Sequence, residues 1–112
     1  MALYFALKAV GVKVGDEVIV PALDWYAATA ATLHLGAIPV FADTEPNLPT
    51  ISPLSVQERI TVRTKAIVAT HLFGYPCNMP ALPTPTRPGN PFGLFPTPHR
   101  PIPFLSPRLL AI

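Results

Sequence analysis

Polar and aromatic residues follow three short apolar segments of this sequence. Asp24 and Trp25 come shortly after the first segment. Asp43 directly follows the second segment, and His71 ends the third. If the segments are parallel strands, these residues share one edge of a sheet, and ligands of open α/β sheets bind outside the carboxyl ends of the strands. An indole beside a carboxylate favours stacking on a flat heteroaromatic ligand.

Each candidate also has an ordinary structural interpretation. Trp25 is either a ligand platform or a core aromatic. His71 is either a base or ligand-orienting group, or a strand-end residue that satisfies backbone groups. Spacing alone leaves both questions open. Asp16 and Glu17 begin the first segment at the opposite edge, and we interpret them as a turn and solvated surface, without a catalytic role.

Cys77 is the single cysteine of the chain. It cannot form an internal disulfide, and we expect its thiol to be inert. Metal sites of the usual kind need several Cys or His side chains at close spacing, so we expect no metal.

The elements that must position these residues alternate between helix and strand. Apolar residues at helical spacing, together with stops at Gly11 and Gly36 and a Ser-Pro start at Ser52, predict helices over residues 1–10, 25–35 and 53–60. Short β-branched runs predict strands over residues 17–20, 38–42 and 66–71. This order predicts an α/β fold, a partial three-layer arrangement around a mainly parallel sheet.

Composition divides the chain at residue 80. Of its 16 prolines, ten lie in residues 80–112, which also carry three arginines and no acidic residue. No stretch beyond Pro80 exceeds five residues without a proline, so we expect no helix or strand of ordinary length there. We therefore expect a folded part over residues 1–79 and a Pro-rich, irregular, disordered tail over residues 80–112.

Several classes of protein are disfavoured by the same composition. Three scattered arginines among prolines are not the clustered basic face that nucleic-acid binding requires. The longest uncharged run, residues 25–42, is interrupted by a histidine and a proline, so we expect neither a membrane span nor a signal peptide. A cytoplasmic protein is the default expectation.

Six motifs in the same order and at matching spacing resemble a known family. They are A-L-x-x-A-L-K-A-V-G-V, G-D-E-V-I-V-P-A, D-W-Y-A-A-T-A-A, L-G-A-I-P-V-F-A-D, R-T-K-A-I-V and H-L-F-G-Y-P. Together they resemble the early large-domain segment of the DegT-type nucleotide-sugar aminotransferases, which are fold-type-I pyridoxal-phosphate enzymes. Each motif is weak alone, but six of them in the family's order and spacing over residues 2–79 argue against a chance match.

The resemblance implies transfer of an amino group from an amino acid, typically glutamate or glutamine, to a keto-sugar nucleotide. It also implies a homodimer with composite active sites. The cofactor would be pyridoxal 5'-phosphate, with Trp25 at the position whose aromatic ring stacks on the pyridine ring. The preceding position is usually Thr or Ser in the family and is Asp24 here.

Other parts that the resemblance implies do not occur in this sequence. They are a Ser-Gly-Thr-type phosphate turn before the first helix, a strand-end aspartate facing the pyridine nitrogen, and the Schiff-base lysine. The only lysines, Lys8, Lys13 and Lys65, do not match that lysine. We therefore expect the chain as written to be truncated and inactive alone, and interpret residues 80–112 as the product of a reading-frame shift.

Three alternatives remain open from the sequence. One is a small nucleotide-binding α/β module with a proline-rich interaction tail, although no G-x-G-x-x-G or G-x-x-x-x-G-K-[ST] phosphate loop occurs. A second is a dehydratase-like relative that uses the same cofactor without the usual lysine. The third is a genuine proline-rich tail, serving as a linker or as an SH3 ligand.

Overall fold

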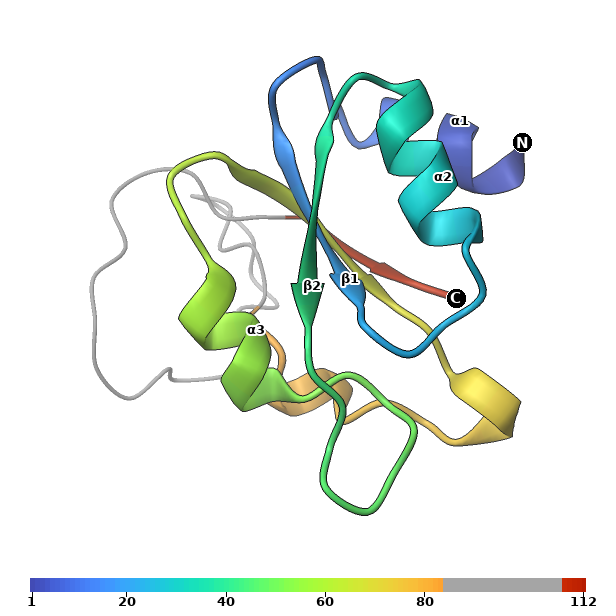
Figure 1. The fold of residues 1–112 in the computed structure, drawn as a ribbon, viewed down its shortest axis with the longest axis vertical. Helices are drawn as coiled ribbons and strands as arrows, with labels where there is room; N and C mark the ends of the chain where they lie inside the picture. Colours follow the sequence, from blue (N-terminus) through green and yellow to red (C-terminus); the bar gives the residue numbers. More distant parts are fainter. Residues whose placement is uncertain (84–107) are drawn as a thin grey trace, which may run out of the picture.

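A computed structural model describes residues 1–83 and 108–112. Helices and strands alternate along the chain (Figure 1), which confirms the predicted α-β-α-β-α-β order. The elements are α1 (Ala2–Ala9), β1 (Glu17–Pro21), α2 (Ala27–His34), β2 (Ile38–Ala42), α3 (Pro53–Arg59) and β3 (Thr64–Ala69), then two short 3-10 helices, η1 (Leu72–Gly74) and η2 (Met79–Ala81), and finally β4 (Arg108–Ala111).

The strands form a parallel sheet in the order β2-β1-β3-β4. Strand β1 is paired on both sides, with Ile19 opposite Val40 of β2 and Ile67 of β3. Because all pairings are parallel, the carboxyl ends of the strands meet at one edge of the sheet. The predicted parallel sheet is confirmed.

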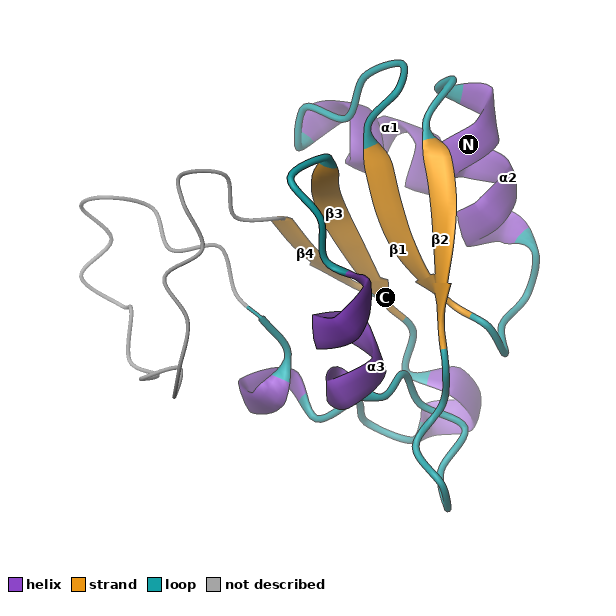
Figure 2. Ribbon diagram, turned by 60° about the vertical axis from the view of Figure 1, so that its left-hand side comes forward, coloured by secondary structure: helices purple, strands orange, loops and turns teal. Residues whose placement is uncertain are grey.

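Helices cover both faces of the sheet, as Figure 2 shows: α1 and α2 lie on one side and α3 on the other. Alternate residues of β1 supply the two cores. Val18 and Val20 pack in one cluster with Leu7 of α1, whereas Ile19 packs in the other with Val56 of α3. The period of two along the strand thus divides its side chains between two helical layers.

Local signals in the sequence explain where the elements begin and end. Ser52 caps α3 by accepting a hydrogen bond from the Ser55 N–H at 3.5 Å, and Pro53 takes the first helical position. Gly36 follows α2 with φ of 69°, and an added Cβ would lie 3.0 Å from Val14. Pro39 lies in β2, an edge strand of the described sheet, where a missing N–H is best tolerated.

Two boundaries differ from the prediction beside the candidate site. Trp25, expected in the first turn of a helix, precedes α2, which begins at Ala27. Strand β3 ends at Ala69 rather than His71. Beyond Ala69 the side chains of Thr70 and His71 bond to Asp24 and to the Cys77 N–H, while the His71 N–H still donates to the Ile112 carbonyl.

The last residues form a short strand, where the sequence analysis expects an irregular tail without strands of ordinary length. Residues Arg108–Ala111 form β4, paired with β3 from Ala66 to Ala69. This segment contains no proline, so every residue in it has an N–H to donate. Leu82 is 2% exposed and belongs to the α3-side cluster, so the packed body extends past residue 79. The expectation for residues 84–107 lies outside the described residues.

The interpretation of Glu17 as solvated surface is wrong. Its side chain is buried and forms an ion pair with Arg63 at 2.8 Å. The Thr61 hydroxyl donates a second bond to the same carboxylate. Strand β1 is central in the sheet, and the loop before β3 folds over its first residue, which the sequence did not reveal. Asp16 does form the predicted turn, accepting a bond from the Lys13 N–H.

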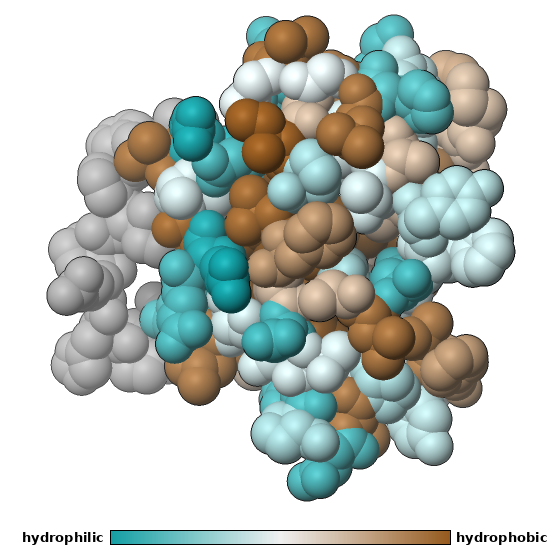
Figure 3. Space-filling model, in the orientation of Figure 1, coloured by the Kyte–Doolittle hydropathy of each residue, from teal (hydrophilic) through white to brown (hydrophobic). Residues whose placement is uncertain are grey.

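The surface seen in Figure 3 carries hydrophobic side chains interspersed with hydrophilic ones. Within residues 1–83 and 108–112, no helix is long and apolar enough to cross a membrane.

Candidate functional site

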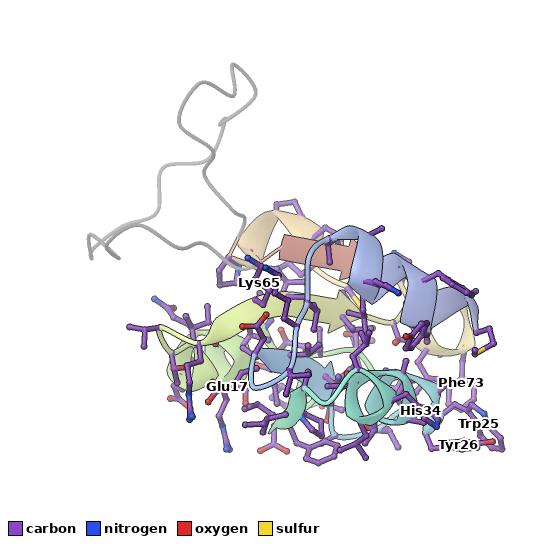
Figure 4. All side chains as sticks on the ribbon, turned by 90° about the horizontal axis from the view of Figure 1, so that it is seen from above. Glu17, Trp25, Tyr26, His34, Lys65 and Phe73 are labelled. Carbon is purple, nitrogen blue, oxygen red and sulfur yellow. The ribbon has the colours of Figure 1, made fainter. Side chains whose placement is uncertain are left out.

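Trp25 lies in the loop between β1 and α2, at the carboxyl edge of the sheet. Its side chain is 71% exposed, which contradicts the core-aromatic alternative. Tyr26 is also exposed, and the two rings lie 4.9 Å apart between centroids with an interplanar angle of 46°. In Figure 4 both residues lie at the opposite end of the molecule from Glu17 and Lys65. An open indole face is therefore available to a planar ligand.

Asp24 joins this loop to the end of β3. Its Oδ1 accepts a hydrogen bond of 2.7 Å from the Trp25 N–H. Its Oδ2 accepts one of 2.6 Å from the hydroxyl of Thr70, a residue 46 positions later. The two strand-end loops that the sequence placed at one edge are thus directly bonded.

His71 forms hydrogen bonds to backbone groups of its own loop and of the chain end. Its Nδ1 accepts a hydrogen bond of 3.0 Å from the Cys77 N–H, and its backbone N–H donates to the Ile112 carbonyl at 2.7 Å. These contacts favour the structural interpretation, in which the ring satisfies a backbone group. With Nδ1 engaged as an acceptor, the neutral ring carries its proton on Nε2.

Cys77 is buried beneath the same loop, and its thiol donates to the Thr70 carbonyl at 3.1 Å. Burial raises the pKa of this thiol above its ordinary value, and the charge of Asp24 raises it further, while a backbone hydrogen bond with Ile51 opposes both. The thiolate is the nucleophilic form of cysteine, so the raised pKa agrees with the expectation of an inert thiol.

Asp43 follows β2 at the same edge, where its backbone bonds to the start of α3. Its N–H donates to the Ser55 hydroxyl at 2.9 Å, and its carbonyl accepts from the Ser52 N–H at 2.8 Å. Asp43 therefore fastens the end of β2 to the start of α3. Of the two strand-end aspartates, Asp24 bonds to the end of β3, whereas Asp43 bonds to the start of α3.

Two residues at this edge escaped the sequence analysis. One is Thr70, whose hydroxyl bonds to Asp24; a polar residue inside a predicted apolar strand was the available signal. The other is Phe73, which has φ of 55° and a side chain 81% exposed, and which Figure 4 shows at the same end as Trp25. A left-handed backbone is costly for a residue other than glycine and is often found at functional sites.

A separate hollow of about 470 Å³ lies between the loop after β2 and the segment before η2. Glu45, Asn47 and Asn78 are among the residues that line it, and Cys77 forms part of its wall. In the part of the chain that the structure describes, no group of three or more His, Cys, Asp or Glu side chains is arranged to hold a metal ion.

The three lysines lie away from the Trp25 edge. Lys65 is the second residue of β3, beside the start of β1, and its side chain approaches Gly11. Lys8 lies in α1 with its Nζ 5.8 Å from the centre of the Tyr4 ring, and Lys13 precedes β1. In Figure 4, Lys65 lies well away from Trp25.

The described residues meet only part of what pyridoxal phosphate requires. The exposed ring of Trp25 would be the contact for the pyridine ring. Residues 108–112, which contain β4 beside β3, include no aspartate or glutamate for the pyridine nitrogen. The described residues alone therefore do not complete a site for the cofactor.

Comparison with known proteins gives consistent matches. The DegT/DnrJ/EryC1/StrS aminotransferase family matches residues 1–85. GDP-perosamine synthase of Escherichia coli O157:H7 is 43% identical over 79 residues, which are 70% of this chain and 22% of that protein.

Two solved structures share the fold. DesV of S. venezuelae, in complex with a ketimine intermediate, superposes with a TM-score of 0.70 at 42% identity, covering 71% of this chain and 22% of that one. NtdA of Bacillus subtilis, with bound cofactor PMP, gives 0.69 at 37% identity, covering 72% and 19%. The chain thus spans about a fifth of the length of these relatives. Over residues 1–85 the match covers well over half of the sequence, and the chain belongs to the DegT/DnrJ/EryC1/StrS aminotransferase family.

Proposed function

We propose that residues 1–79 are the early large-domain segment of a pyridoxal-phosphate-dependent enzyme. Its reaction is the transamination of a keto-sugar nucleotide, with an amino acid as donor. The observation that carries the proposal is the exposed indole of Trp25 at the carboxyl edge of a parallel sheet, in a family of aminotransferases. The cofactor, when bound, supplies an electron sink for the amino-transfer chemistry.

Within that reaction, this segment binds the cofactor and orients its pyridine ring. Trp25 offers one ring face to the pyridine, and Asp24 holds the loop that carries it. The loop after β1 and the residue after β3 are bonded to each other through Asp24. Proton transfer at the reacting carbon belongs to groups outside the described residues.

The assembly and location follow from the family in the same proposal. The intact enzyme is a cytoplasmic homodimer with sites shared between subunits. The 112-residue chain alone lacks a lysine near Trp25, so we propose that it does not catalyse the reaction by itself.

A chimera tests this proposal. Residues 2–79 would replace the corresponding segment of a full-length relative such as GDP-perosamine synthase. We expect the chimera to retain bound cofactor and to aminate its keto-sugar nucleotide. The Trp25→Ala chimera should keep its fold and lose cofactor on dialysis, whereas Leu33→Ala, which alters an exposed side chain of α2, should not.

Two results would contradict the proposal. A folded chimera that binds no cofactor would remove the family function from this segment. Equal retention of cofactor by the folded chimera and by its Trp25→Ala variant would remove the indole from the cofactor site.

A further inference from the structure

The carboxylate of Asp24 bonds through both oxygens, one to the loop that carries Trp25 and one to the neighbouring strand end. The Trp25 N–H donates to Oδ1 at 2.7 Å, and the Thr70 hydroxyl donates to Oδ2 at 2.6 Å. We propose that Asp24 is a positioning residue, which sets the orientation of Trp25 by tying the β1–α2 loop to the end of β3.

Burial cannot orient Trp25, because most of its side chain is in solvent. The indole contacts the Tyr26 ring, which is itself 67% exposed. Helix packing does not begin until Ala27, and Tyr26, at the N-cap of α2, makes no side-chain capping bond. A loop of this kind moves on the nanosecond timescale unless hydrogen bonds restrain its backbone. The bond from the Trp25 N–H to Asp24 acts on the residue that bears the ring.

The other end of the bridge is anchored. Thr70 directly follows β3, a strand paired on both sides, and its carbonyl accepts the bond from the buried Cys77 thiol. Thr70 is therefore held both by the sheet and by the loop beneath it. The hydrogen bond from Thr70 to Asp24 therefore restrains the more exposed loop between β1 and α2.

A carboxylate suits this task better than a hydroxyl side chain would. Each of its two oxygens accepts one bond, so both donors are satisfied at once, and bonds to an ionised acceptor are stronger than neutral ones. A threonine hydroxyl has a single oxygen, one bond closer to the backbone. The two carboxylate oxygens of Asp24 therefore serve both donors of the bridge.

The single tryptophan of the chain allows a direct test in the 112-residue protein without any cofactor. Time-resolved fluorescence anisotropy reports the internal motion of Trp25, and circular dichroism with urea unfolding reports the fold. The variants are Asp24→Ala, Thr70→Val and Thr70→Ser. Asp16→Asn is the matched control, because Asp16 also accepts a bond from a nearby backbone N–H but lies at the opposite edge.

We expect Asp24→Ala and Thr70→Val each to raise the amplitude of nanosecond motion about twofold. The double variant should add little, because both changes break the same tie. Thr70→Ser keeps the hydroxyl and should behave like the parent, as should Asp16→Asn. If Asp24→Ala fails to fold, Thr70→Val against Thr70→Ser decides the question.

Unchanged anisotropy in a folded Thr70→Val protein would overturn the proposal, as would equal effects of Thr70→Val and Thr70→Ser. The role toward the cofactor rests on the proposed function and is measured separately, by cofactor retention in the full-length chimera. If Trp25→Ala leaves retention in the chimera unchanged but the anisotropy results hold, the cofactor platform fails while the positioning role stands.

Discussion

The Nδ1 atom of His71 accepts a hydrogen bond from the backbone N–H of Cys77, across 3.0 Å and six residues. The bond closes the loop that contains η1 and places the Cys77 side chain under Thr70. A histidine that sequence alone leaves between catalysis and structure is therefore engaged in shaping the edge that carries Trp25.

His71→Ala should lower the free energy of unfolding by about 1 kcal/mol, since the partly buried Cys77 N–H loses its acceptor. His71→Asn, whose side-chain oxygen can take the place of Nδ1, should recover most of that loss. Urea unfolding curves measure both. Equal destabilisation by the two variants would contradict this role for the ring nitrogen.

Arg63→Ala should lower the free energy of unfolding by at most about 1 kcal/mol, because the arginine is largely exposed although its partner Glu17 is buried. The loss should shrink as salt is added, since ions screen the exposed charge. Arg59→Ala, at an exposed position of α3, is the control and should change the unfolding free energy little. A salt-independent loss in Arg63→Ala would point to packing rather than charge.

The stability of the protein should fall on the alkaline side, because the pKa of Cys77 is raised in the folded state. The folded protein holds the thiol proton more tightly than the unfolded chain, whose thiol has a pKa of about 8.5. The contribution is complete below that pH and is lost as the pH rises through the folded value.

The control for this prediction is Cys77→Ser, which keeps a donor for the Thr70 carbonyl and does not titrate in this range. Unfolding free energies of the two proteins should diverge in their pH dependence only above neutrality. Parallel curves would show that the thiol does not contribute.

The amide of His71 should exchange slowly with solvent, because it donates to the Ile112 carbonyl beyond the end of β4. Leu110→Pro removes an N–H from β4 and should speed exchange at His71 and along the edge of β3 that faces β4. Hydrogen exchange read by NMR measures this. Fast exchange at His71 in the parent protein would favour the irregular tail expected from the prolines.

Treatment with pyridoxal phosphate and borohydride should label the three lysines weakly and without preference, because none lies near Trp25. Peptide mapping by mass spectrometry gives the extent at each site. Trp25→Ala should leave the labelling unchanged. Stoichiometric labelling of one lysine, abolished in Trp25→Ala, would reveal a site that this arrangement does not explain.

Short-range physics made much of the fold predictable. The β-branched run before Pro21, the glycine after α2 and the Ser52-Pro53 pair act within a few residues, so their consequences are readable from the sequence. The sequence also predicted that Trp25 lies at the carboxyl edge of the sheet, because it follows the first strand and parallel strands end on the same side.

Only the tertiary structure decided which polar groups meet. Asp24 and Thr70 are 46 residues apart, and Glu17 and Thr61 are 44 apart, so no local pattern relates them. Sheet order puts β1 beside β3, which brings one pair together at the carboxyl edge and buries the other at the opposite edge. Long-range strand pairing therefore determined both interactions. It lets Asp24 bond to Thr70, and it buries Glu17 in an ion pair with Arg63.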